Sequence, residues 1–387
     1  MILLSVIIWC VLGIPIFCMP LIYSKLAVDE GVAAYALKYT RYTYPFLLLD
    51  LIGLSYLTYA GAQKVVSFSV LSVLPAMACQ AITLKVLYSS YGWGFESILA
   101  ANGVMFVVRL LMAWALVTKS GKFKPFDDVY FFSRETVANI GPMVTIGCQG
   151  VAMGVWGWYC YDIFGLMASR MGEEEVGAAA VMRIVAMSAV MIPIGITNAG
   201  GLLITISLGA GKARQAMQYY TAALVQGLII TLSVIALIHW NRDAVFGAFS
   251  ENDSVIERVK QAQVSFYLYV FFALTASLGA TVIKGTGQQG KGAIFTAIAY
   301  IGFAIPIALY LGFTKEMSLT GLWLGPVSAE VFLTICYNIW ISQIEWRPLI
   351  LIAKKRAAKE AEVKAKLEAE AKEEATDDNF TKPNQIN

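Results

Sequence analysis

The feature that most constrains this sequence is a succession of long apolar stretches, with little charge between them, from residue 1 to residue 344. An apolar stretch of about 20 residues is long enough to cross a lipid bilayer as a helix. We therefore predict an all-α polytopic membrane protein with about ten transmembrane helices. The predicted spans cover residues 1–24, 43–62, 65–88, 98–118, 138–168, 176–208, 218–240, 264–283, 293–313 and 319–343.

The distribution of charge divides the chain into segments. Residues 345–387 hold 18 of the 55 charged side chains in only 43 of the 387 residues. We predict an N-terminal lobe of four transmembrane helices at 1–118, a cytoplasmic linker at 119–137, a C-terminal lobe of six transmembrane helices at 138–345 and a charged cytoplasmic tail at 346–387. The tail has helical spacing of Lys and Glu without an apolar stripe, which favours a solvated helix over a partner-binding one.

Basic residues next to the last predicted span indicate the orientation. Arg347, Lys354, Lys355 and Arg356 follow that span directly, and such residues are enriched on the cytoplasmic side of membranes. With an even number of spans, both termini are then expected in the cytoplasm. Residues 1–24 have no basic start and lead into further spans, so we interpret them as a retained helix. The expected location is a plasma or vacuolar membrane.

Several classes of function are disfavoured by composition. A net charge of +3 without a basic stripe predicts no nucleic-acid partner. The six cysteines lie in apolar stretches without paired spacing, and the chain has one histidine, so we predict neither disulfides nor a metal site. No nucleophile with a base can be assembled, which argues against an enzyme and against a cofactor. The expected partners are the lipid bilayer and a small organic substrate; the sequence leaves the oligomeric state open.

Two segments of the sequence are similar to each other. DEGVAAYALKYTRYTYPF at 29–46, followed by YAGAQK at 59–64, is similar to NDSVIERVKQAQVSFYLY at 252–269, followed by IKGTGQQGK at 283–291. Transporter folds are commonly built from internal repeats. We therefore predict two pseudo-repeat lobes, of which the first is incomplete, because the spans at 138–168 and 176–208 have no counterpart in it. Chance similarity is the alternative.

Three acidic residues lie inside the predicted spans: Asp50, Asp162 and Glu330. A charged side chain at such a depth costs about 2.5 to 3.5 kcal/mol on insertion scales, which makes each acid a candidate for function. A carboxyl group enclosed in a helical bundle is also the kind of group that can exchange protons near neutral pH. The three acids are therefore the candidate ion-binding or substrate-binding groups.

Asp162 lies near the end of its predicted span, beside Trp158, Tyr159 and Tyr161. Trp158 and Tyr161 are about one helical turn apart, so one aromatic wall could flank the carboxylate. Such a wall suits a flat organic cation, which binds aromatic faces. The alternative is an interfacial acid within the aromatic belt of a membrane protein.

Each of the other two acids also has an alternative interpretation. Glu330 lies near the middle of the last predicted span, and its alternative role is a buried ion pair with Arg183 or another base. Asp50 lies at a depth similar to that of Arg109. We favour a structural Asp50–Arg109 pair over a binding role for Asp50.

Six further segments stand in this order: IPIG at 192–195, SLGAGKARQA at 207–216, VFGAFSENDSVI at 245–256, IKGTGQQGKGA at 283–293, IPIALYLGF at 305–313 and TGLWLGPVSAE at 320–330. In order and spacing they resemble the eukaryotic branch of the multidrug and toxic compound extrusion (MATE) transporters. The resemblance implies two six-helix lobes around a central cavity, and export of organic compounds in exchange for protons or sodium ions. The first four predicted spans look like the third to sixth helices of the family, so its first two helices are expected to be absent here.

The sequence departs from the family at acidic positions. WYCYD at 158–162 looks like the Trp-Trp-x-(Phe/Tyr)-Glu stretch of the seventh helix, with Asp162 as a shortened acid. The Glu that precedes the Trp pair is replaced by Gly157, and an acid of the tenth helix by Ala273. We hypothesise that Glu330 substitutes for the lost acids.

The sequence therefore predicts a secondary active antiporter that exports cationic or amphipathic organic compounds. The alternative is a degenerate, non-transporting relative that acts as a membrane scaffold or partial assembly, which the lost acids and missing helices favour. The retained Asp162 and Glu330 favour transport.

Overall fold

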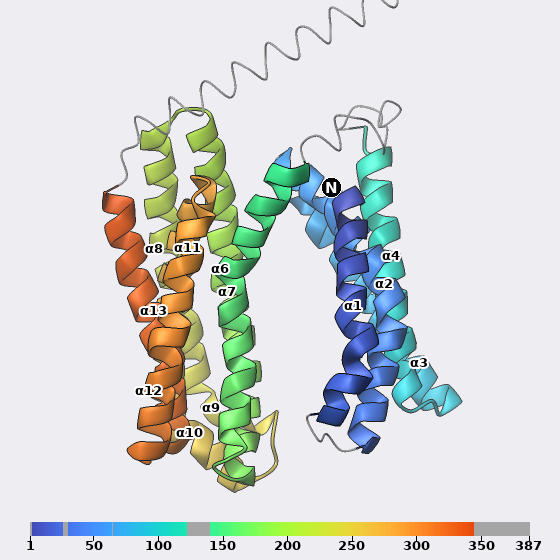
Figure 1. Ribbon diagram of the computed structural model, residues 1–387, viewed down its shortest axis with the longest axis vertical. Coiled ribbons are helices and arrows are strands. Elements are labelled where there is room, and N and C mark those ends of the chain that lie inside the picture. Colours follow the sequence, from blue (N-terminus) through green and yellow to red (C-terminus); the bar gives the residue numbers. More distant parts are fainter. Residues whose placement is uncertain (1, 26–29, 64, 122–139, 344–387) are drawn as a thin grey trace, which may run out of the picture. The chain divides into compact units, whose positions relative to one another are not determined.

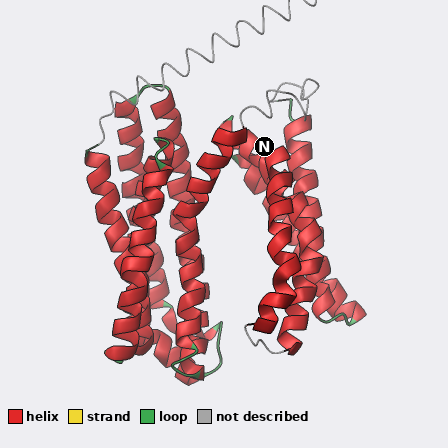
Figure 2. Ribbon diagram, in the orientation of Figure 1, coloured by secondary structure: helices red, strands yellow, loops and turns green. Residues whose placement is uncertain are grey.

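The structure is a computed structural model that describes residues 2–25, 30–63, 65–121 and 140–343 (Figure 1). Within these ranges the chain forms helices joined by short loops, and no strand is present (Figure 2). The chain divides into two compact units, Met1–Gly141 and Pro142–Asn387, called here unit 1 and unit 2. The predicted linker lies almost wholly, and the predicted tail entirely, outside the described residues, so the predicted segment boundaries stay predictions.

Unit 1 is built from four long helices. They are α1 (Ile2–Lys25), α2 (Glu30–Ala62), α3 (Ser67–Tyr91) and α4 (Phe95–Lys119). Helix α4 packs against both α2 and α3, and α1 packs against α2. A small apolar core holds α2, α3 and α4 together; it consists of Leu57, Ala60, Phe68, Ala113 and Val117.

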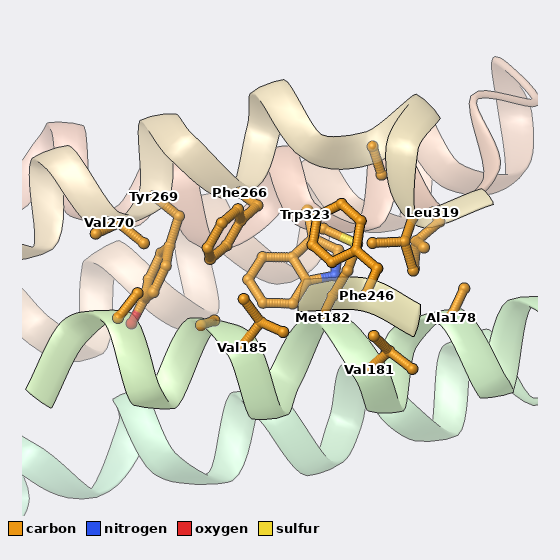
Figure 3. Packing of buried hydrophobic residues seen from close by; sticks show 14 of the residues in the cluster. Ala178, Val181, Met182, Val185, Phe246, Phe266, Tyr269, Val270, Leu319 and Trp323 are labelled. Atoms are coloured by element: carbon orange, nitrogen blue, oxygen red, sulfur yellow. The ribbon is translucent and has the colours of Figure 1, made fainter. Parts of the chain in front are cut away.

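Unit 2 is centred on α10 (Asp253–Gly285), which packs against α7 (Glu173–Gly209), α8 (Ala213–Trp240) and α13 (Ser318–Ser342). It also contains α6 (Ile140–Ala168) and the short α9 (Arg242–Gly247). Figure 3 shows side chains from α7, α9, α10 and α13 meeting around the indole of Trp323. Burial of this apolar surface fixes the relative positions of the helices within unit 2.

The segment between α10 and α13 is an interrupted helix. It consists of α11 (Gln289–Ala297), the π-helix η2 (Ile298–Ala304), α12 (Ile305–Leu309) and the π-helix η3 (Tyr310–Thr314). Pro306 at the start of α12 has no backbone N–H to donate, which helps to explain why regular α-helical bonding stops there. The sequence predicted a plain span at 293–313 and did not anticipate the π-helices.

Nine helices in the described ranges are long and apolar enough to cross a membrane. The remaining predicted span, at 138–168, is the 29-residue helix α6, which is not among these nine and contains polar residues such as Gln149 and Asp162. The spans predicted to start at 43 and 264 belong to helices that start at Glu30 and Asp253, since the amphipathic segments before them are also helical. The predicted all-helical, polytopic fold is confirmed.

Helix boundaries repeat along the chain with a constant offset. Helices α2 and α10 each have 33 residues, and α4 and α13 each have 25. The starts Glu30 and Asp253, and likewise Phe95 and Ser318, are 223 residues apart. This agreement supports the internal repeat.

Candidate functional site

Glu330 lies on α13 and is only 7% exposed. Its Oε1 atom accepts a hydrogen bond of 2.6 Å from the hydroxyl of Tyr300, a buried residue of the π-helix η2. No basic side chain in the described ranges pairs with Glu330, and Arg183 pairs with a different acid. The alternative of a Glu330–Arg183 pair is therefore wrong.

A close approach between helices brings these two residues together. A Cβ atom added to Gly325 would lie 2.5 Å from the carbonyl oxygen of Ala304 and 2.8 Å from the Cβ of Ala308. Gly325 thus lets α13 pack directly against the backbone of η2 and α12, as small residues do at membrane helix interfaces. Glu330 follows Gly325 by just over one turn and meets Tyr300 there.

Two cavities of unit 2 include Glu330 in their lining. Their volumes are about 140 Å³ and 320 Å³, and both are lined also by Gly157, Trp158 and Tyr300. Side chains of α6, α7, α10, η2 and α13 contribute to them. The carboxyl group of Glu330 therefore lies where five elements of unit 2 meet, and Thr296 of α11 also lines the larger cavity.

The smaller cavity also contains the positions at which the sequence departs from the family pattern. Gly157 and Ala273 both line it together with Glu330. A Cβ atom on Gly157 would lie 3.3 Å from the hydroxyl oxygen of Tyr300, so the glycine leaves space beside the group that binds Glu330. A carboxyl group is thus present in this cavity on α13, whereas Gly157 and Ala273, the positions at which the resemblance implies acids, lie on α6 and α10.

The larger cavity has several polar side chains in its lining. Thr197 and Asn198 of α7 line it opposite Ser277 and Thr281 of α10, and Lys284 lies near the C-terminal end of α10. These side chains can donate and accept hydrogen bonds, which orient a polar ligand in a mainly apolar site. Sequence analysis identified none of them as site residues.

The predicted aromatic wall lies partly at this site. Trp158 lines both cavities and is 59% exposed, whereas Tyr161 is buried and lines the smaller one. The ring of Tyr161 packs edge-on against Tyr269, with 5.9 Å between ring centroids. Tyr159 is exposed and lines none of the described cavities. Trp158 and Tyr161 thus share a cavity with Glu330, and neither shares one of the described cavities with Asp162.

Asp162 forms an ion pair at the surface of unit 2. Its Oδ1 atom accepts a hydrogen bond of 2.8 Å from Nη1 of Arg183, and its side chain is 63% exposed. Arg183, but not Asp162, lines a third cavity of about 170 Å³. Asp162 lines none of these three cavities, so none of them is shared by Asp162 and Glu330. This geometry favours the interpretation of Asp162 as an interfacial acid.

Asp50 lies on α2 of unit 1 and pairs with Arg109 of α4. The distance from Asp50 Oδ1 to Arg109 Nη1 is 2.6 Å, and about a fifth of each side chain is exposed. The structural pair favoured by the sequence is thus present.

Nothing in the sequence pointed to Tyr300, the residue whose hydroxyl donates a hydrogen bond to Glu330. Tyr300 is one of 19 tyrosines and lies 30 residues before Glu330, so no spacing rule connects the two. Lys284 does occur in the IKGTGQQGK segment, which is similar to YAGAQK at 59–64. That repeat was the signal in the sequence that this segment has a structural role common to both copies. In the parts of the chain that the structure describes, no cluster of three His, Cys, Asp or Glu residues could hold a metal ion.

Comparison with known proteins gives consistent matches. A family model called MatE matches residues 154–310. The chain is 31% identical over 212 residues to multidrug and toxin extrusion protein 2 of Mus musculus, which covers 55% of this chain and 36% of that protein. It is 26% identical over 245 residues to multidrug and toxin extrusion protein 1 of Danio rerio, covering 63% of this chain and 40% of that protein. The match therefore spans about two fifths of the length of these relatives.

Solved structures resemble the whole described fold. The crystal structure of the eukaryotic MATE transporter AtDTX14 matches with a TM-score of 0.84 and 21% identity, over 92% of this chain and 79% of that chain. An outward-facing conformation of a multidrug resistance MATE family transporter matches with a TM-score of 0.72 and 17% identity, over 92% and 78%. At these identities the likeness shows the fold.

Proposed function

Because this chain belongs to the multidrug and toxic compound extrusion family, we propose that it is a secondary active antiporter. It exports cationic or amphipathic organic compounds in exchange for protons or sodium ions. It acts as a multi-pass protein of the plasma or vacuolar membrane, with both termini in the cytoplasm. Its segments are an N-terminal lobe at 1–118, a cytoplasmic linker at 119–137, a C-terminal lobe at 138–345 and a cytoplasmic tail at 346–387.

The observation that carries the proposal is the environment of Glu330. This carboxyl group is buried, lines two cavities and has no basic partner among the described residues. A buried carboxylate without a counter-charge is costly, and that cost is removed when it takes up a proton or contacts a cation. A proton, a sodium ion and an organic cation therefore compete for one carboxyl group. Such competition is the simplest basis for exchange of one cation against another.

The aromatic side chains around the cavity support an organic cargo. Trp158 is exposed at the lining of both cavities, and Tyr161 lies beside it in the smaller one. A cation over the face of a tryptophan or tyrosine is attracted by the ring, by about 0.5 to 2 kcal/mol. Glu330 supplies the charge and the aromatic rings supply the contact area for the organic part.

Transport assays with purified full-length protein test this proposal. The protein is reconstituted into liposomes, and flux of labelled tetraethylammonium is measured under an imposed proton or sodium gradient. We expect gradient-driven flux in the wild type and its loss in E330Q. E251Q, which changes an exposed acid outside the described cavities, serves as the matched control. Absence of flux under both gradients, or equal flux in wild type and E330Q, would contradict the proposal and favour the scaffold alternative.

A further inference from the structure

A set of exposed basic side chains lies at the end of unit 2 where α7 connects to α8 and α10 connects to α11. A Cβ atom added to Gly285 would lie 2.6 Å from Oγ1 of Thr205, one turn before the end of α7, so the two connections are neighbours. Figure 1 shows both connections at the same end of unit 2. The exposed basic residues in and beside them, called here the basic surface, are Lys212, Arg214, Lys284 and Lys291.

The segments that form the basic surface contain no acid to balance its charge. The sequence has no Asp or Glu from 176 to 242 or from 258 to 315. None of the four basic side chains forms an ion pair in the ranges that the structure describes. Basic residues are common at cytoplasmic helix ends, but here they are present without any acidic neighbour in the same segments. Such a surface attracts anions.

The space above both connections is open. A Cβ atom added to Gly209, or to Gly287 in the α10–α11 connection, would meet nothing within 4 Å. Glycine and alanine form most of the α7–α8 connection, so no bulky side chain shields the charges beside it. A headgroup with the size of a phosphate ester can therefore approach the basic side chains directly.

Exposed apolar side chains continue from the basic surface along two helices. Lys291 of α11 is followed on the same helix face by Ile294 and, one turn later, by Ile298 at the start of η2, and both isoleucines are exposed. On α8, Arg214 shares a face with the exposed Val225. A soluble phosphate would contact only the charges, whereas a phospholipid also covers the apolar faces with its acyl chains. The arrangement therefore favours a lipid.

We propose that the basic surface binds the headgroups of anionic phospholipids, whose acyl chains lie along α8 and α11. With both termini in the cytoplasm, this surface faces the cytoplasmic leaflet, in which phosphatidylserine and other anionic lipids give a negative surface potential. The proposal goes beyond the proposed function and does not depend on transport. Because α11 continues into η2, a bound lipid contacts the same interrupted helix that carries Tyr300, the partner of Glu330.

Spin-labelled phospholipids test the proposal. Purified full-length protein is reconstituted into phosphatidylcholine membranes, and electron spin resonance measures the fraction of labelled lipid that the protein immobilises. We expect the wild type to associate with labelled phosphatidylserine at least threefold more strongly than with labelled phosphatidylcholine. The preference should decrease at high salt, because salt screens exposed charges. Equal association of the two lipids with the wild type would overturn the proposal.

A triple variant locates the preference. K212Q/R214Q/K291Q removes three charges of the basic surface and keeps Lys284, whose side chain also lines the larger cavity. We expect this variant to lose most of the preference for phosphatidylserine. K212R/R214K/K291R keeps the charges and should retain the preference. A K212Q/R214Q/K291Q protein that prefers phosphatidylserine as strongly as the wild type would refute the assignment to this surface.

The matched control removes the same charge at the opposite end of unit 2. R170Q/R242Q/K315Q changes three basic residues that follow α6, α8 and η3, and we expect it to keep the lipid preference of the wild type. An equal loss of preference in both triple variants would mean that net charge alone, and not the basic surface, attracts the lipid.

Two other occupants of the basic surface are distinguished by further measurements. Glycerophosphoserine is the headgroup without acyl chains, and at the same concentration as the labelled lipid it should not reduce the preference. If it does, the surface binds soluble anions and the lipid assignment is wrong. The acidic side chains of residues 346–387 are the second alternative. A preference that appears only after removal of these residues would identify the tail as the occupant and overturn the proposal.

Flux of tetraethylammonium in the same membranes separates this inference from the proposed function. A preference for phosphatidylserine without gradient-driven flux supports the inference and contradicts transport. Flux without any lipid preference contradicts the inference and leaves transport intact.

Discussion

The hydroxyl group of Tyr300 donates a hydrogen bond of 2.6 Å to Oε1 of Glu330, and both side chains are at least nine-tenths shielded from water. The two residues come from a π-helix and from α13, and Gly325 lets these elements approach closely. π-Helical turns occur frequently at functional sites. The bond therefore connects an irregular helix to a buried carboxyl group that lines two cavities of unit 2.

Removing the hydroxyl of Tyr300 should destabilise the protein. We expect Y300F to lower the free energy of unfolding by about 1 to 3 kcal/mol, because a buried carboxyl group loses its hydrogen-bond donor. Y310F removes the hydroxyl of an exposed tyrosine on η3 and should have almost no effect. Thermal unfolding of the detergent-purified variants measures the difference. Equal stability of the two variants would show that the Tyr300–Glu330 bond contributes little.

Because α13 packs closely against η2 and α12, a single methyl group added at Gly325 should destabilise the protein. G325A places a Cβ atom 2.5 Å from the carbonyl oxygen of Ala304, so the helices must separate. We expect a loss of about 1 to 3 kcal/mol, the usual cost of overpacking. In G302A the nearest atom to the added Cβ lies 3.8 Å away, so this variant is a suitable control. Similar unfolding temperatures for G325A and G302A would contradict the close contact.

In unit 1, removing one member of the Asp50–Arg109 pair should lower the free energy of unfolding more than removing both members together. R109L leaves the carboxylate of Asp50 without its partner in a largely enclosed position, and we expect a loss of about 3 kcal/mol. The double variant D50L/R109L removes both charges and should recover much of that loss. Unfolding measurements on a double-mutant cycle give the coupling energy.

A control for this cycle is the pair formed by Lys38 and Glu96, which also joins α2 to α4 but is more exposed. K38Q should change stability by less than about 1 kcal/mol. If R109L were as mild as K38Q, the Asp50–Arg109 pair would have no special structural role.

The surface position of Asp162 predicts a weak phenotype. Its ion pair with Arg183 is about half exposed on both sides, and pairs of this kind contribute about 0 to 1 kcal/mol. We expect D162N to change the dissociation constant of tetraethylammonium less than twofold, whereas E330Q changes it at least tenfold. Equilibrium binding to the purified variants tests this difference. Loss of binding in D162N would return Asp162 to the binding site.

Hydropathy predicted most of the fold, because the positions of membrane-spanning helices follow from the length and composition of apolar stretches, and these can be taken directly from the sequence. It placed every long helix but missed the helical segments before residues 43 and 264, where amphipathic residues continue the helix beyond the apolar stretch. It also missed the π-helices, since nothing in local composition distinguishes π from α bonding at Ile298–Ala304.

The candidate site was predictable only in part. The position of Glu330 deep in an apolar stretch identified it as a functional candidate, because a charged side chain at that depth in a membrane is energetically costly. The partners of the acids depend on how helices rotate against each other, which hydropathy does not fix. For this reason Arg183 was considered for Glu330 although it pairs with Asp162, and Tyr300 was not considered at all. Lys284 lies one residue beyond the predicted span at 264–283, so hydropathy gave no reason to place it in a cavity.

The central claim is that Glu330 is the carboxyl group at which the organic cation competes with the coupling ion. The most direct test measures the affinity of purified protein for tetraethylammonium while proton and sodium concentrations are varied. We predict that one of these ions weakens binding in the wild type and in E251Q, and that neither has an effect on the residual binding of E330Q. Competition that persists in E330Q, or that is absent from the wild type for both ions, would contradict the account.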